Sequence, residues 1–527
     1  MAMHDPAPIP NPAKPADKRE SLVLMHHHLN RGGVTRVIEN QLYSIDSVLK
    51  GGSKLPVQIF YGGRASGWSD AIKDKLQNID LSLRPLSDLD YDQETGGVSP
   101  AKLSEGLLRN LAARGLSPEH TVVHCHNHSL GKNAALPKAL KALAQSEYGM
   151  LLQIHDFAED LRPDNYRHLM KAHASDASAL YPQAERIHYA VLNQRDFAVL
   201  DRAGLDAERL HFLPNPVAAP ENLPSYEVAR ERLEQAAGLP RDERLILYPV
   251  RGIGRKNVGE FLLWSALVPE KTTLAMTLGP VNPKERAVYD HWKAFAADEQ
   301  LPVMFELGET EGLGFEDCMC AADKIISTSV AEGFGMAFLE CWLYGKSLMG
   351  RDLPEITADF KSAGLKLDGL QDAIWIPLDW TGGRAFVDCI TEYYGELTQK
   401  YDIEDVVGET EAASKKVKEG LVDFADLSAE LQMTVLKKVM RDPSKLETIK
   451  QLNPKLVKTL GFEDESSLLE ENKRLAGAEF SFPANGSRLQ DIYSSVREAQ
   501  VGPVTGLSDA RSIVDSFIDP SRIRVLR

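Results

Sequence analysis

Two successive series of short apolar runs, each run followed by a longer amphipathic stretch, constrain the fold of this chain more than any other feature. The first series predicts strands at 21–26, 55–61, 121–126, 151–155 and 187–193. The second predicts strands at 245–250, 272–278, 302–307, 323–328 and 373–378. Helices are expected between them at 34–48, 101–113, 132–145, 257–266, 284–297 and 337–345. Such alternation is typical of parallel sheets covered by helices, so the fold class is α/β with two Rossmann-like domains.

The length and a proline-rich segment divide the chain. Its 527 residues exceed a single core, which stops growing near roughly 250–300 residues. Four prolines between 210 and 226 interrupt any helical period, so we place a hinge-like linker at 214–225. We expect a disordered tail (1–20), an N-terminal Rossmann-like domain (21–217), a C-terminal one (218–394) and a helical extension (395–527).

Composition excludes several classes of function. A net charge of −16 disfavours binding to nucleic acid or anionic membranes, which requires clustered Lys and Arg. No apolar run reaches the roughly 20 residues of an integral membrane segment. The first residues lack a secretory signal, and five cysteines make an odd number, so we expect a cytoplasmic protein without disulfides. A homodimer is compatible with the sequence.

The most informative segment is STSVAEGFGMAFLECWLYGKSLMG (327–350), where a predicted strand meets a predicted helix. Glu332 precedes Gly333, Phe334 and Gly335, a turn that can present backbone N–H groups to a ligand. Glu340 follows eight positions after Glu332, and residues i and i+8 of one helix lie on nearly the same side. Two carboxylates in one site suit vicinal hydroxyls. The alternative is a glycine-containing turn with two solvated glutamates.

A basic loop, VRGIGRKN (250–257), lies between another predicted strand and helix. Arg251 and Lys256 can converge on a diphosphate from such a loop. Arg255 adds a further cation, which leaves the assignment between the two arginines open. The alternative is a basic loop that faces solvent.

Together these two segments resemble family 4 retaining glycosyltransferases, whose GT-B architecture has two Rossmann-like domains facing a cleft, with a C-terminal helix that returns to the N-terminal domain. The resemblance implies that Glu332 meets the hydroxyls of the transferred sugar and Glu340 the ribose, while Arg251 and Lys256 neutralise the leaving nucleoside diphosphate. The backbone amides of Gly333, Phe334, Gly335, Met336 and Ala337 approach sugar and phosphate. The chain departs from the family at Asn257, where Gly is common.

Two N-terminal features match the same family. Gly32 and Gly33 follow the first predicted strand, where the family has a glycine loop that closes over the donor. His155, at the end of a later predicted strand, corresponds to a histidine that reaches the transferred sugar, which would add it to the catalytic group of Glu332, Arg251 and Lys256. A lone histidine is more often structural.

The cluster HCHNHSLGK (124–132) allows two further hypotheses. His124, His126 and His128 would share one face of a strand, yet they lack a carboxylate or cysteine partner of matching spacing, so we expect no metal. His128 and Lys132, with Arg31, are instead candidates for binding a small, soluble and anionic acceptor. Ordinary packing is the alternative for His128.

The sequence therefore predicts a retaining hexosyltransferase that uses a nucleoside diphosphate sugar as co-substrate and needs no further cofactor. The resemblance implies a same-face reaction in which the leaving diphosphate helps to deprotonate the acceptor. Two other classes stay open: a nucleotide-sugar epimerase of similar fold, and an inactive regulator that binds sugar or nucleotide. The base, the sugar, the acceptor and the role of 395–527 are not specified by the sequence.

Overall fold

The computed structural model describes residues 19–403 and 409–526, which form two compact units. Unit 1 comprises the chain up to Pro216 together with Phe482–Ser516, and unit 2 comprises Val217–Ser481 and Phe517–Arg527. The chain passes from unit 1 to unit 2 within the segment 214–225. The tail expected over 1–20 lies outside the described residues, apart from its last two positions.

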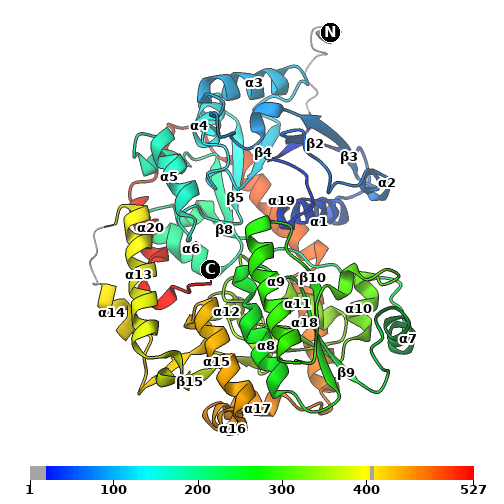
Figure 1. Ribbon diagram of the computed structural model, residues 1–527. Helices are drawn as coiled ribbons and strands as arrows, with labels where there is room; N and C mark the ends of the chain where they lie inside the picture. The colour runs from blue at the N-terminus through cyan, green and yellow to red at the C-terminus, as the bar shows by residue number, and fades with distance from the viewer. Residues whose placement is uncertain (1–18, 404–408, 527) are drawn as a thin grey trace, which may run out of the picture. The chain divides into compact units, whose positions relative to one another are not determined.

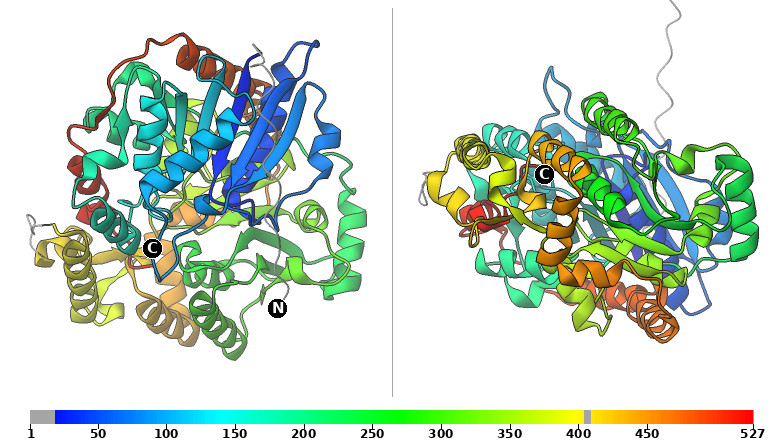
Figure 2. Two further views of the ribbon diagram at one scale, coloured as in Figure 1. Left: turned by 90° about the horizontal axis from the view of Figure 1, so that it is seen from above. Right: turned by 60° about the horizontal axis from the view of Figure 1, so that its bottom comes forward.

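Unit 1 contains a seven-stranded parallel sheet in the order β3-β2-β1-β4-β5-β7-β8, whose first strands lie side by side in the left view of Figure 2. The strands are β1 (Ser21–His26), β2 (Leu55–Tyr61), β3 (Ile79–Pro85), β4 (Thr121–His126), β5 (Gly149–Ile154), β7 (Ile187–Val191) and β8 (Leu210–Phe212). The helices are α1 (Gly33–Val48), α2 (Ala71–Lys75), α3 (Pro100–Ala112), α4 (Leu136–Gln145), α5 (Pro163–Ala172), α6 (Gln194–Arg202) and α19 (Phe482–Glu498). A two-stranded sheet pairs β6 (Pro182–Gln183) with β17 (Thr505–Gly506), and α20 (Arg511–Phe517) follows.

Unit 2 repeats this architecture with a six-stranded parallel sheet in the order β11-β10-β9-β12-β13-β14. Its strands are β9 (Arg244–Arg251), β10 (Thr272–Leu278), β11 (Val303–Met304), β12 (Lys324–Ser327), β13 (Ser347–Arg351) and β14 (Leu370–Gln371). The helices of the α/β part are α7 (Tyr226–Ala237), α8 (Val258–Leu267), α9 (Pro283–Asp298), α10 (Phe315–Ala321), α11 (Ala337–Leu343) and α12 (Pro354–Ser362). In both units the strand order reverses beside the first strand, so the fold is α/β with two Rossmann-like units, as the sequence predicts.

Two expectations need correction. The strand expected at 373–378 is β15 (Trp375–Pro377), which does not join the main sheet but pairs antiparallel with β16 (Leu421–Asp423). The segment from 395 is therefore not purely helical. Its helices are α13 (Arg384–Tyr401), which begins before 395, then α14 (Glu409–Ser414), α15 (Ala429–Arg441), α16 (Pro443–Leu452), α17 (Pro454–Thr459), α18 (Ser466–Glu479), α19 and α20.

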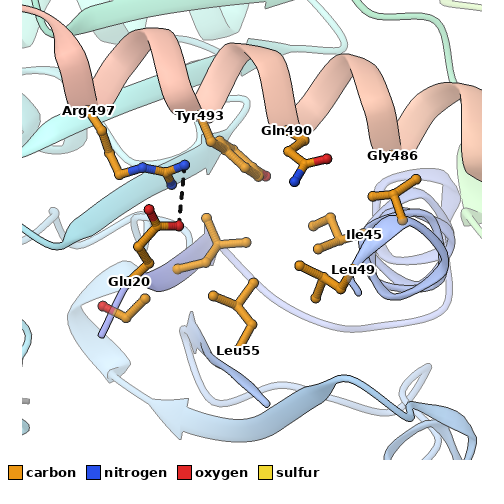
Figure 3. A pocket seen from close by; sticks show the side chains of 11 residues that line it. Glu20, Ile45, Leu49, Leu55, Gly486, Gln490, Tyr493 and Arg497 are labelled. Carbon is orange, nitrogen blue, oxygen red and sulfur yellow. Dashed lines mark ion pairs between the residues drawn. The ribbon is translucent and has the colours of Figure 1, made fainter. Parts of the chain in front are cut away.

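The helix α19 completes the core of unit 1, although it lies more than 260 residues after β8 in the chain. Gly486, Gln490 and Tyr493 of α19 line a small, mostly apolar cavity of about 60 Å³ with Ile45 and Leu49, and Figure 3 shows the Glu20–Arg497 ion pair at its rim. A cavity of this size is far below that of a typical ligand pocket, roughly 300–1,000 Å³. The cavity is a packing gap between α1 and α19.

At the crossing of α1 and α19, the backbone of Gly486 lies so close to α1 that a methyl group there would overlap the Ser44 carbonyl. We predict that Gly486→Ala destabilises the protein by about 1–3 kcal/mol, because the two helices must move apart. Gly106→Ala in α3 is the matched control: no atom lies near its new methyl group, and it should be neutral or stabilising by roughly 0.5–1 kcal/mol. Thermal and urea unfolding measure both, and equal stability of the two variants would contradict the close packing.

Candidate functional site

The carboxyl ends of β9 and β12 mark the reversal of strand order in unit 2, the place where open α/β sheets bind ligands. The loop 252–257 leaves β9 and the loop 328–336 leaves β12. Several hydrogen bonds join the two loops. The Val330 amide donates to the Arg255 carbonyl at 2.9 Å, and the Thr328 hydroxyl donates to the Lys256 carbonyl at 2.8 Å. The two sequence motifs are thus brought together into one site.

Glu332 is the centre of this site. Its carboxylate accepts hydrogen bonds from the Lys256 ammonium, from Nη1 of Arg255 at 2.8 Å and from the Ser329 hydroxyl at 2.6 Å. The side chains of Glu332 and Lys256 are each only 11% exposed, so this ion pair is poorly screened by solvent. The site therefore contains two cations that are paired with one carboxylate.

The electrostatics of the pair follow from burial and charge. Burial alone would raise the pKa of the Glu332 carboxyl, but Lys256 and Arg255 outweigh it and lower the pKa to about 2. At Lys256, burial lowers the pKa of the ammonium and the charge of Glu332 counteracts this shift. Glu332 is consequently ionised throughout the working pH range and is a weak base.

Arg251 forms no hydrogen bond or ion pair with Glu332 within the described residues, and its convergence with Lys256 on a diphosphate stays a prediction. Its Nη1 donates to the Gly279 carbonyl at 2.6 Å, at the end of β10. Arg255 is the arginine that pairs with Glu332 beside Lys256. Asn257 ends the loop with φ of 51°, a left-handed conformation that Asn tolerates better than most residues, which explains how it replaces the glycine common in the family.

The glycine turn after Glu332 also differs in detail from the expectation. Gly335 has φ of +81°, and α11 begins only at Ala337, so Glu332 lies in the loop and does not share a helix with Glu340. The helical argument that placed both carboxylates on one side therefore does not apply. Glu340 is half-buried in the first turn of α11, whereas Gly333 and Met336 precede the helix. The Phe334 ring packs against Phe360 with centroids 5.4 Å apart, so only its backbone is available to a ligand.

In unit 1, Gly32 and Gly33 are exposed at the start of α1. Gly32 has an extended backbone that any residue could adopt, and a methyl group at Gly33 would meet no neighbouring atom. The fold of unit 1 therefore does not itself require glycine here. Bare backbone at this position is what close approach of a ligand requires.

The histidines form a buried cluster at the carboxyl ends of β1, β4 and β5. His155 Nε2 lies 3.0 Å from His126 Nδ1, and His124 lies between the Tyr493 hydroxyl and the Gln153 side chain. Burial lowers the pKa of His155 to about 4, so its ring is neutral. Within 19–403 and 409–526, no three His, Cys, Asp or Glu side chains are grouped so as to hold a metal ion.

His128 is buried to 1% exposure in unit 1, with Nε2 3.1 Å from the Leu180 carbonyl. This position favours the packing alternative over acceptor binding. Arg31 is exposed and Lys132 is half-buried. The ammonium of Lys132 lies 5.6 Å from the centre of the Tyr91 ring, over which Arg64 also lies at 4.9 Å.

Sequence reasoning missed Arg64 and Tyr91, which belong to loops that follow β2 and β3. Arg64 is held by Asp90, whose carboxylate accepts from Nε at 2.7 Å, and the Tyr91 hydroxyl bonds to His28 Nε2 at 3.0 Å. Arg64 directly follows Gly62 and Gly63 at the end of β2, so the sequence does carry a Gly-Gly pair after this predicted parallel strand. That pair, followed by a cation, is the signal that could have pointed to Arg64.

We predict that Glu332→Gln destabilises unit 2 by ~3–5 kcal/mol at pH 7, because it leaves buried Lys256 without its counter-charge. The folded pKa lies below the ordinary value of 4.5, so the stabilisation is present above pH 4.5 and disappears as the pH falls towards 2. Five of the six tryptophans lie in unit 2, so urea unfolding followed by tryptophan fluorescence measures this difference.

Exposed Glu447 on α16 provides the matched control, and Glu447→Gln should unfold like the wild type at every pH. A constant difference between Glu332→Gln and wild type from pH 7 to pH 3 would contradict the ion-pair assignment.

Comparison with known proteins gives one extended sequence match. The chain is 27% identical over 515 residues to a mannosylglucosyl-3-phosphoglycerate synthase of Petrotoga mobilis, which covers 96% of this chain and 97% of the relative. No protein-family model matches the chain. No helix within the described residues combines the length and apolar character needed to cross a bilayer.

Solved structures provide the comparison of folds. The chain is similar to HepE of Anabaena in complex with UDP and glucose, with 12% identity, 90% of this chain and 100% of that chain covered, and a TM-score of 0.50. Sucrose-phosphate synthase of Thermosynechococcus elongatus (14% identity, 90% and 98% covered) has a TM-score of 0.53. A glycosyltransferase of Rickettsia africae (13%, 91% and 99%) has a TM-score of 0.51. The resemblance to the GT-B glycosyltransferases is therefore confirmed: the chain has their fold and is similar over nearly its whole length to a mannosylglucosyl-3-phosphoglycerate synthase.

Proposed function

We propose that this protein is a retaining glycosyltransferase that moves a hexosyl group from a nucleoside diphosphate sugar to a small anionic acceptor. The observation that carries the proposal is the pairing of Glu332 with Lys256 and Arg255 at the strand-order reversal of unit 2. Two cations in a loop can balance the charge that develops on a leaving diphosphate. A carboxylate beside them can accept hydrogen bonds from sugar hydroxyls.

The low pKa of Glu332 bears on the mechanism. A carboxylate with a pKa of about 2 and three hydrogen-bond donors is a poor nucleophile and a poor general base. We therefore propose that an oxygen of the departing diphosphate, which lies on the same face of the sugar as the acceptor, accepts the proton of the acceptor hydroxyl. The acceptor oxygen then bonds to the anomeric carbon as the diphosphate leaves, and the anomeric configuration is retained. Glu332 orients the sugar, and neutral His155 is proposed as a hydrogen-bonding partner of that sugar.

The acceptor is proposed to be a phosphorylated glyceric acid glycoside. The relative's name specifies a mannosyl group on glucosyl-3-phosphoglycerate, a small molecule with a phosphate and a carboxylate. In unit 1, Arg31 and Lys132 form no ion pair with a described carboxylate, and the ammonium of Lys132 lies over the Tyr91 ring. Loop cations without counter-charges, in a protein of net charge −16, suit such an anion. We accordingly propose a mannosyl donor.

A donor and acceptor screen tests the function. The protein is mixed with nucleoside diphosphate glucose and mannose donors, with and without glucosyl-3-phosphoglycerate, and products are identified by mass spectrometry and the anomeric configuration by NMR. Release of nucleoside diphosphate only with acceptor supports transfer. Conversion of the donor sugar alone would indicate an epimerase, and binding without turnover an inactive regulator.

Five free cysteines agree with the proposed cytoplasmic location.

For the acceptor site, we predict that Arg31→Ala and Lys132→Ala each raise the acceptor KM about tenfold or more and leave donor affinity unchanged. Each variant removes a charge-assisted bond of roughly 1.5–3 kcal/mol. Lys138→Ala, on the exposed surface of the neighbouring helix α4, is the control and should behave as wild type. Steady-state kinetics with each substrate varied in turn separate the effects. Wild-type acceptor kinetics in both variants, or equal use of a neutral acceptor, would refute the anionic site.

For the donor site, we predict that Glu340→Gln weakens binding of the free nucleoside diphosphate about tenfold, by removing bonds to the ribose. Glu332→Gln should instead keep or strengthen this binding, because it frees Lys256 and Arg255 from their internal counter-charge, while turnover falls at least tenfold. Calorimetric titration and single-turnover kinetics measure both. An equal loss of nucleotide affinity in the two variants would contradict the assigned roles.

A further inference from the structure

The segment 517–526 belongs to unit 2, although it follows a stretch of chain that belongs to unit 1. Its apolar side chains Phe517, Ile518 and Ile523 are buried. Arg522 forms an ion pair with Glu355 of α12, with Nη2 2.8 Å from Oε2. The segment is therefore anchored along its length and is not a loose end.

The end of this segment reaches the basic loop 252–257. A methyl group built at Gly254 would lie 3.1 Å from the Leu526 carbonyl oxygen, so the two backbones are nearly in contact. The Gly254 amide donates to Glu285 Oε2 at 2.8 Å. Gly254 immediately precedes the two cations that pair with Glu332. The segment thus borders the loop on which the proposed donor site depends.

A chain of buried polar contacts links the same segment to the far end of the loop. Nη1 of Arg524 lies 3.3 Å from the Asp423 carboxylate and also pairs with Asp426. Asp423 accepts two bonds of 2.8 Å from Arg351, and Arg351 Nε donates to Glu260 at 2.8 Å.

Glu260 links this series of polar contacts to Asn257, the last residue of the loop. The Asn257 side-chain amide donates to Glu260 Oε2 at 2.8 Å, and its oxygen accepts from the Glu260 amide at 3.3 Å and from Gln432 Nε2 at 2.9 Å. Asn257 is the left-handed residue that follows Lys256. Its conformation is therefore held through contacts that continue to Arg524.

We propose that the segment 520–526 is a positioning element of the donor site, which fixes the loop 252–257 from both ends so that Arg255 and Lys256 are ordered before the diphosphate binds. The inference rests on the proposed function for the identity of the ligand. Arg524 does not touch the ligand; it acts through Asp423, Arg351, Glu260 and Asn257. Ordering a loop in advance removes an entropic cost of binding, so the segment affects donor affinity and not acceptor affinity.

Arg524→Met tests this proposal, with Arg441→Met at the exposed end of α15 as the matched control. The full-length variants are titrated with UDP and GDP by calorimetry, and amide hydrogen exchange is measured for peptides covering 252–257. We expect Arg524→Met to raise the nucleotide Kd at least tenfold and to accelerate exchange in this loop, with an unchanged acceptor KM. Arg441→Met should change none of these.

Arg524→Lys covers the case in which Arg524→Met does not fold, because a lysine can keep the pair with Asp426 but not both ion pairs. It should raise the Kd about threefold and accelerate loop exchange to a smaller extent. Wild-type nucleotide affinity and loop exchange in either folded variant, even with a lowered Tm, would overturn the proposal and leave a purely stabilising role. Failure of the wild-type protein to bind any nucleotide would instead refute the proposed function, while altered exchange in 252–257 would still measure the positioning.

Discussion

Unit 2 depends on a buried guanidinium. Arg351, at the end of β13, is 2% exposed and lies between Glu260 of α8 and Asp423 of β16. Taking three charges out of water costs several kcal/mol for each ion, and only close pairing with complete hydrogen bonding offsets that cost. The strand, the helix and the hairpin must therefore occupy fixed relative positions, or the charges are left uncompensated. Because α8 begins at the basic loop, this constraint also determines where Lys256 lies.

The meeting of the two loops that form the proposed donor site could be predicted from the sequence, but the pairing of their side chains could not. Strand alternation places the segments of Lys256 and Glu332 at adjacent strand ends, which is a local inference combined with the general topology of parallel sheets. The pairing of Arg255 with Glu332 depends on the path of the loop, which follows from the left-handed Asn257 and from bonds to the neighbouring loop. Gly335 delays the start of α11 in a similar way. These conformations are set by tertiary contacts that periodicity does not contain.

Pairing between segments far apart in the sequence accounts for the remaining differences between the predicted and the observed structure. Trp375–Pro377 has the apolar pattern of a core strand, yet its partner Leu421–Asp423 comes more than 40 residues later, in a segment that reads as helical. The histidine cluster shows that strand periodicity also fails to predict how side chains are buried. Alternation along a strand predicts which residues share a face, but not the depth at which they are buried. His128 is buried with its Nε2 beside the Leu180 carbonyl, whereas Arg31 and Arg64 are exposed on the loops that follow β1 and β2.

The ion pair of Glu332 has a second consequence for the proposed reaction. In the unliganded protein the carboxylate neutralises part of the charge of Lys256 and Arg255, so the loop is ordered without a ligand. A bound diphosphate competes for the same two cations, and the hydroxyls of the donor sugar offer Glu332 replacement donors. The two exchanges are favourable together and costly separately, since either alone leaves a buried charge unpaired. A nucleotide sugar can satisfy both groups at once, whereas a free nucleoside diphosphate satisfies only the cations. Under the proposed function, the site would therefore bind the intact donor more tightly than the product, which would favour product release after transfer.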